Sequence, residues 1–247
     1  MTSIETTNLF LKGWRELEDK GLPGNLLFLK LAGSHGHNVS TANSDTDYLG
    51  VYQLPTEKIL SIHQEHTSYV TKDPDVTLHE VGKFCSLLLK GNPNIIEMLF
   101  TNRYTYKSKP WLDLLTHKKE FLSKAAVKQY LGYAQGQMDR YLKGKPVHGT
   151  GGKPNSKWAY HFMRLLFDAN RIVLGGEPIP WKEYSERELL LDIRQNKLSI
   201  PEITGLWRKL INKVADRLKI CGLPDKGNYD LLNDWLLKCR RNNGTNT

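Results

Sequence analysis

The stretch that most constrains the fold is residues 26–54, where two polar motifs lie between two apolar runs. A Gly-Ser turn at 33–34 follows the run over 26–31, and an Asp-Thr-Asp triplet opens the run over 45–54. Side chains alternate along a strand, so the spacing predicts Asp45 and Asp47 on one face. Paired carboxylates can share divalent metals, and such a turn offers backbone N–H groups to a phosphate. The pattern predicts metal-dependent chemistry on a nucleoside triphosphate.

A third carboxylate on a neighbouring strand would complete such a site. Residues 75–79 alternate polar and apolar, which predicts a half-buried strand with Val76 and Leu78 toward the core. That register places Asp75 on the other face and favours it as the third acid. A shift of one residue exchanges the faces and would favour Glu80 instead. Two metals held by such acids can stabilise the attacking and leaving oxygens of an in-line displacement.

The turn itself predicts the phosphate contacts. Gly33 lets the backbone approach the ligand closely, and the hydroxyl and N–H of Ser34 are expected to hold the β- and γ-phosphates. His35 lies beside the turn and is a further candidate contact. Carboxylates and phosphates supply the oxygen ligands that Mg²⁺ takes, so the expected cofactor is two Mg²⁺ ions, with Mn²⁺ as the substitute. The histidines as a group do not show structural-zinc spacing.

Composition indicates the partners and the cellular compartment of the protein more than its reaction. The chain has 247 residues and a formal net charge of +9, which favours polyanionic partners, although a functionally silent basic surface is the alternative. No apolar run approaches the roughly 20 residues that span a bilayer, and the N-terminus lacks the pattern of a secretory signal. Three widely spaced cysteines form neither a zinc pattern nor a disulfide framework. We therefore expect a cytoplasmic protein without a membrane partner.

Two regions of different character follow from the periodicity. Residues 1–110 mix strand and helix signals, starting with a helix over 7–20, and predict a small mixed sheet packed with helices. Residues 111–240 are mostly helical, and 241–247 are expected to be a disordered tail. The predicted class is α+β. A basic loop is expected over 143–154. Helices are expected over 111–117, 122–143, 155–174, 185–195, 201–219 and 228–240.

The run GSHGHNVSTANSDTDYLGVY resembles the signature of the DNA polymerase beta-type nucleotidyltransferase superfamily. The narrower resemblance is to the RlaP-like nucleotidyltransferases, and it rests on LLLKGNPNIIEMLF, YLGYAQGQ, KWAYHFMRLL and RELLLDIRQNKLS. It covers roughly residues 26–235 and implies an acid triad with Mg²⁺ and an NTP, with ATP expected as the donor. One departure is the pair of histidines flanking Gly36, where relatives often carry Arg or Ala.

Within KWAYHFMRLL, one helix face carries Lys157, His161 and Arg164 at i, i+4 and i+7. The resemblance implies that these three bind the triphosphate or the acceptor, whereas a solvated polar face is the alternative. The basic charge favours an RNA end as the hydroxyl acceptor. Nucleotidylation of a protein hydroxyl and a catalytically silent nucleotide- or RNA-binding protein are the other two hypotheses.

Overall fold

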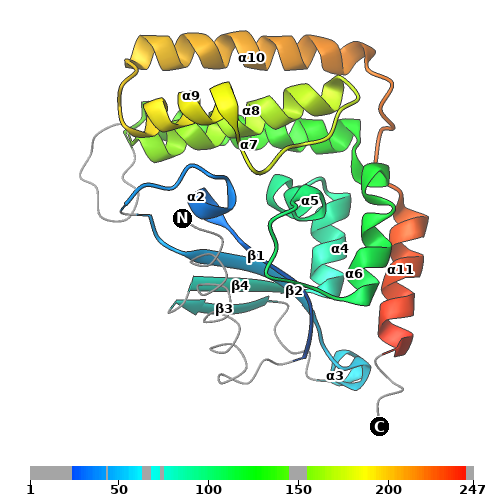
Figure 1. Cartoon of the computed structure of the whole chain (residues 1–247). Coiled ribbons are helices and arrows are strands. Elements are labelled where there is room, and N and C mark those ends of the chain that lie inside the picture. Colours follow the sequence, from blue (N-terminus) through cyan, green and yellow to red (C-terminus); the bar gives the residue numbers. More distant parts are fainter. Residues whose placement is uncertain (1–23, 43, 63–67, 73–74, 145–154, 243–247) are drawn as a thin grey trace.

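A computed structural model describes residues 24–42, 44–62, 68–72, 75–144 and 155–242 of the chain (Figure 1). The helix predicted over 7–20 and most of the basic loop predicted over 143–154 lie outside these residues. Within the described residues, strands come from the N-terminal part and long helices follow, so the predicted α+β class is confirmed.

Five strands form one mixed sheet with the order β3-β4-β2-β1-β5. The central β2 runs antiparallel to β1 and parallel to β4, and the outer strands β3 and β5 pair antiparallel to β4 and β1. Their bounds are β1 (Asn25–Leu31), β2 (Asp47–Gln53), β3 (Ser68–Lys72), β4 (Asp75–Glu80) and β5 (Tyr106–Lys107). The expected strand at Asp45 therefore begins two residues later.

The two faces of the sheet have different surroundings. On one face, Val76 and Leu78 of β4 join Tyr48 and Tyr52 of β2 in a small apolar cluster. This is the register that the alternation in the sequence predicts. On the other face, Asp75 and its neighbours open onto a cavity that the helices cover. Because β2 and β4 are parallel and in register, their polar side chains meet on that second face.

Helices cover the sheet and extend beyond it. Short elements α2 (Gly33–Gly36) and α3 (Thr56–Leu60) flank the first strands, and a 3₁₀ turn η1 spans Lys118–Phe121. The longer helices are α4 (Val81–Leu89), α5 (Pro93–Phe100), α6 (Lys109–Leu115), α7 (Lys124–Leu142), α8 (Ser156–Val173), α9 (Tyr184–Arg194), α10 (Ile200–Ile220) and α11 (Tyr229–Asn242). In Figure 1, α7 to α10 lie together on one side, above α2 and the sheet.

Capping side chains explain why several helices begin where they do. Asn92 accepts from the backbone N–H groups of Asn94 and Ile95 at the start of α5. Ser123 caps α7, and Ser199 forms a capping box with Glu202 on α10. Each cap satisfies N–H groups that have no partner inside the helix. These local signals lie in the sequence, which is why the predicted helix ranges are close to the observed ones.

One large apolar cluster joins the sheet to the helices on both sides of residue 110. It includes Phe28 of β1, Phe84 of α4, Trp111 of α6 and Phe162 of α8. Phe28 stacks on Trp111 with ring centroids 4.3 Å apart. The division into domains at 110 stays a prediction, but the core packing is continuous across it.

The C-terminal helix α11 returns to the sheet and packs against α4 (Figure 1). Its Trp235 indole donates to the Pro110 carbonyl at 2.8 Å, and its Arg240 binds the Glu80 carboxylate. The helix continues through Asn242, so the first two residues of the tail predicted over 241–247 are helical, and the rest of that tail lies outside the described residues.

Candidate active site

Two carboxylates lie side by side where β2 and β4 begin. Asp47 and Asp75 are the first residues of these parallel strands and are paired in register. Burial raises the pKa of Asp47, and the charge of Asp75 raises this pKa further. Asp47 is half-buried and Asp75 is exposed, and two like charges held next to each other favour a cation between them. The pair therefore has the electrostatics of a divalent-metal site.

The glycine turn touches the first of these acids. Gly33 has φ +56°, and a Cβ atom on it would lie 2.4 Å from Asp47 Oδ2. The neighbouring Ala32 N–H donates to the Asp47 carbonyl at 2.8 Å. Only glycine combines this left-handed backbone with so close an approach. The turn and the acid thus form one structural unit, as the sequence motif suggested.

The structure places the other turn residues in the short helix α2. Ser34 is buried, and its carbonyl accepts from the Val39 N–H at 3.0 Å. A ring nitrogen of His35 lies 3.3 Å from the Ser44 carbonyl oxygen, and the charge of His35 acts to lower the pKa of Asp47. Neither residue lines the cavity beside the acid pair; Ser34 follows Gly33 in the turn, and His35 acts on Asp47 only through its charge.

Asp45 is not assembled with the other two acids. It lies before β2 rather than in it, its side chain is exposed, and it does not line the cavity. The strand alternation that predicted a shared face for Asp45 and Asp47 therefore does not apply. Its charge still contributes to the raised pKa of Asp47, so it remains near the pair.

Glu80, the alternative third acid, is held elsewhere. It caps α4 by accepting from the Gly82 N–H at 2.6 Å, and it makes a bidentate pair with Arg240. The alternation of β4 puts it on the face opposite to Asp75. Of the two candidates, only Asp75 lies beside Asp47.

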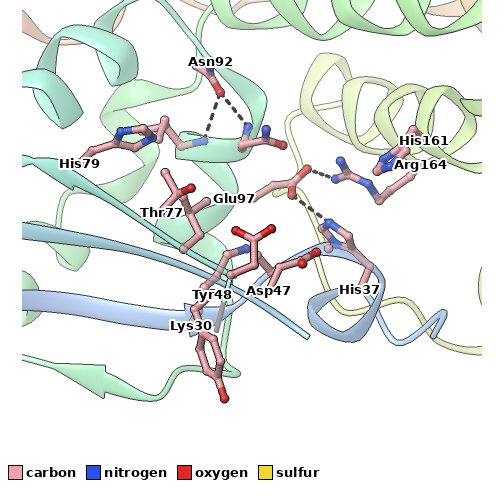
Figure 2. A pocket seen from close by; sticks show the side chains of 16 residues that line it. Lys30, His37, Asp47, Tyr48, Thr77, His79, Asn92, Glu97, His161 and Arg164 are labelled. Carbon is pink, nitrogen blue, oxygen red and sulfur yellow. Dashed lines mark hydrogen bonds and ion pairs between the residues drawn. The ribbon is translucent and has the colours of Figure 1, made fainter. Parts of the chain in front are cut away.

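A cavity of about 370 Å³ opens beside the acid pair, between the sheet, α5 and α8 (Figure 2). This volume is in the range of small-ligand pockets. Polar side chains line most of it, including Lys30, Asp47, Asp75, Thr77, His79, Asn92, Asn94, His161 and Arg164. Among the described residues, no group of three or more metal-ligating side chains is preassembled. Mg²⁺ commonly needs only one or two carboxylates plus phosphate oxygens and water, so Asp47 and Asp75 fit its donor set.

A buried ion pair forms one wall of the cavity. Arg164 of α8 binds Glu97 of α5, and the side chains are 3% and 1% exposed. His37 lies on the other side of Glu97, with Nε2 3.8 Å from Oε2 (Figure 2). Burial lowers the pKa of His37 well below its usual value, so the ring is neutral, and its Nδ1–H donates to the Pro180 carbonyl at 3.1 Å. The Glu97 charge is thus balanced by Arg164 rather than by His37.

The three predicted residues of α8 separate into different environments. His161 and Arg164 line the cavity, and burial lowers the pKa of His161 well below its usual value. Lys157 is exposed in the first turn of α8, and its charge lowers the pKa of Asp47. The shared face predicted from the spacing is therefore directed at the site. Arg164, however, is already engaged by Glu97.

The helical part also holds the loop between α2 and β2. Arg187 Nε donates to the Asn38 carbonyl at 2.9 Å, and Arg194 donates to the Val39 carbonyl at 2.5 Å and to Ser44 Oγ at 3.3 Å. This loop leads directly into the acid motif. Two arginines of α9 thus fix the segment that precedes Asp45.

Sequence reasoning missed Lys30, Glu97 and His37 as site residues. Lys30 and Glu97 each stand alone as a charge inside an apolar run, 26–31 and 95–100. When such a run is buried, its charged side chain needs an ion-pair partner or a polar cavity. This isolated charge is the sequence signal for a site residue. For His37 the available signal is its place beside the phosphate-binding turn.

The fold and the acid pair define a class. A small mixed sheet that presents two carboxylates beside a glycine turn matches the polymerase beta-type nucleotidyltransferases that the sequence resembles. A sequence model of the RlaP family, described as the RNA repair pathway DNA polymerase beta family, matches residues 11–215. The chain belongs to this family. No curated protein matches it. In the described part of the chain, no helix is both long and apolar enough to cross a membrane.

Proposed function

We propose that this protein is a metal-dependent nucleotidyltransferase that moves NMP from an NTP, with ATP as the expected donor, to the hydroxyl of an RNA end. The observation that carries the proposal is the in-register pair of Asp47 and Asp75 on the cavity face, with Gly33 against Asp47. Family membership supports nucleotidyl transfer in RNA repair. The net charge of +9 supports a polyanionic acceptor.

In this proposal Asp47 and Asp75 hold Mg²⁺, and Asp45 is the third acid near them. Bound there, the metal would stabilise the negative charge that develops on the attacking and leaving oxygens. Gly33 keeps the turn close to the Asp47 carboxylate, because any side chain there would meet Asp47 Oδ2. The charge of Lys157 lowers the pKa of Asp47, so this exposed lysine is close enough to the acid pair to bind the phosphates.

The test incubates the purified protein with each α-labelled NTP, Mg²⁺, and either RNA with a free hydroxyl end or a protein extract. We expect label on the RNA. Asp47→Asn and Asp75→Asn should each lower the rate at least about a hundredfold, because metal charge stabilisation is worth several kcal/mol. Asp216→Asn, an exposed acid on α10, is the matched control and should keep the wild-type rate.

Two results would overturn this reading. Label on protein instead of RNA would favour protein nucleotidylation. Equal labelling by wild type, Asp47→Asn and Asp75→Asn, or no labelling by any, would remove the enzymatic assignment.

A further inference from the structure

Three cationic side chains are buried in the described residues, and one of them differs from the others. As whole residues, Lys30, Arg164 and Lys182 are 2%, 2% and 0% exposed. Arg164 pairs with Glu97, and Lys182 pairs with Asp168 at 2.6 Å. Within the described chain, the Lys30 ammonium has neither an ion pair nor a hydrogen bond. A buried charge without a partner is costly, so its position calls for an explanation.

Lys30 lies on β1 and lines the cavity together with Asp47 (Figure 2). Its strand pairs with β2, where Lys30 is opposite Leu49, two residues after Asp47 on the same face. Burial lowers the pKa of Lys30 to about 8, while the Glu97 charge acts to raise it and the Arg164 charge to lower it. At neutral pH the side chain is therefore still mostly an ammonium group.

The charge balance of the cavity indicates the kind of ligand. Its lining has two cations, Lys30 and Arg164, against three carboxylates, Asp47, Asp75 and Glu97. Glu97 and Arg164 neutralise each other, and a divalent cation would neutralise the acid pair. The ammonium of Lys30 then remains as an uncompensated positive charge in a desolvated place. An anionic group of the ligand would compensate it.

We propose that Lys30 binds a phosphate group of the nucleoside triphosphate in this cavity. The inference rests on the proposed function, because that function supplies the triphosphate as ligand. The alternative is that Lys30 only balances the charge of Glu97. Arg164 already does so by direct contact, whereas no ion pair joins Lys30 to Glu97 in the described residues.

The experiment measures binding rather than turnover. Calorimetry with the full chain compares the Mg²⁺ complex of a non-transferable ATP analogue, in which a methylene group bridges the α- and β-phosphorus atoms, with adenosine. For Lys30→Met we expect affinity for the analogue to fall about 10- to 100-fold, since a hydrogen bond to a charged group contributes roughly 1.5–3 kcal/mol. Affinity for adenosine should stay within about twofold.

Lys83→Met is the matched control, because Lys83 is a half-buried lysine that donates to Ser68 and does not line the cavity. It should bind the analogue like wild type. If Lys30→Met does not fold, Lys30→Gln keeps a polar group without the charge and is measured in its place. Unchanged affinity for the analogue in these variants overturns the inference, as does an equal loss for adenosine.

The two proposals fail in different ways. Wild type that transfers label while Lys30→Met binds the analogue normally would refute the role of Lys30 alone. Wild type that binds the analogue through Lys30 but transfers nothing would refute the proposed function and leave the role of Lys30 supported.

Discussion

Replacing Arg164 with Met tests whether this arginine holds the fold or the nucleotide. The change keeps most of the aliphatic length and removes the charge that faces Glu97. Both side chains are almost fully buried, at 3% and 1% exposed. Removing one partner of a buried pair typically costs ~3–5 kcal/mol, because the other charge is left without compensation. For a chain of this size we expect the melting temperature to fall by roughly 6–20 °C.

The double variant Glu97→Met/Arg164→Met completes a thermodynamic cycle. With both charges removed, most of the loss should be recovered, and the coupling free energy should exceed ~2 kcal/mol. Urea unfolding at pH 7, followed by circular dichroism, gives the free energy of unfolding of each variant. The control cycle uses the exposed pair Asp216 and Lys219, whose side chains are 74% and 73% exposed. Its coupling should be below ~1 kcal/mol.

A cost below ~1 kcal/mol for Arg164→Met, with no coupling to Glu97, would refute the buried pair as a stabilising contact. If that variant also lost affinity for a triphosphate, Arg164 would be a nucleotide ligand, as the helix spacing first suggested.

Three further predictions concern the cavity. Gly33→Ala should cost ~1–2 kcal/mol of stability, measured by urea unfolding, because the backbone of Gly33 is left-handed. It should also lower transfer activity in the labelling assay, because the new methyl group would collide with Asp47 Oδ2. The raised pKa of Asp47 means that its ionised form destabilises the fold at neutral pH and that protonation at lower pH relieves this. At pH 7 without added metal, Asp47→Asn should therefore have a higher melting temperature than wild type. Added Mg²⁺ should raise the melting temperature of wild type more than that of Asp47→Asn. A lower melting temperature for Asp47→Asn without metal would contradict this. At pH 8, wild type should bind up to about half a proton more than Lys30→Met when the ATP analogue binds, since a phosphate would raise the lowered pKa of Lys30 again. Calorimetry in buffers of different ionisation enthalpy measures this proton uptake.

Much of the fold follows from local patterns in the sequence. The helix predicted over 122–143 is observed as α7, Lys124–Leu142, and the helix predicted over 155–174 is observed as α8, Ser156–Val173. Periodicity and capping residues act within a few positions, so they can be read without knowing the tertiary structure. The strand expected from Asp45 was placed too early, because its start is set by pairing with β4, a contact distant in sequence.

The parts of the candidate site that belong to a local sequence motif could be predicted. The parts that depend on contacts between residues far apart in the sequence could not. The Gly-Ser turn, Asp47 and Asp75 could be named from spacing and alternation. The pairing of Glu97 with Arg164 joins residues 67 positions apart, and no local pattern reports it. For Arg164, the sequence predicted the correct face of the helix but not the partner that occupies it.

These contacts explain why the loop before Asp45, unlike the acid pair, depends on the helical part of the chain. Asp47 and Asp75 are placed by strand pairing, which the sheet supplies alone. The loop before Asp45 is held instead by Arg187 and Arg194 of α9. Bringing Asp45 toward the pair would require residues 44–46 to move, and the contact between Arg194 and Ser44 resists this. Asp45 is therefore held in place from α9, whereas Asp47 and Asp75 are held by the sheet.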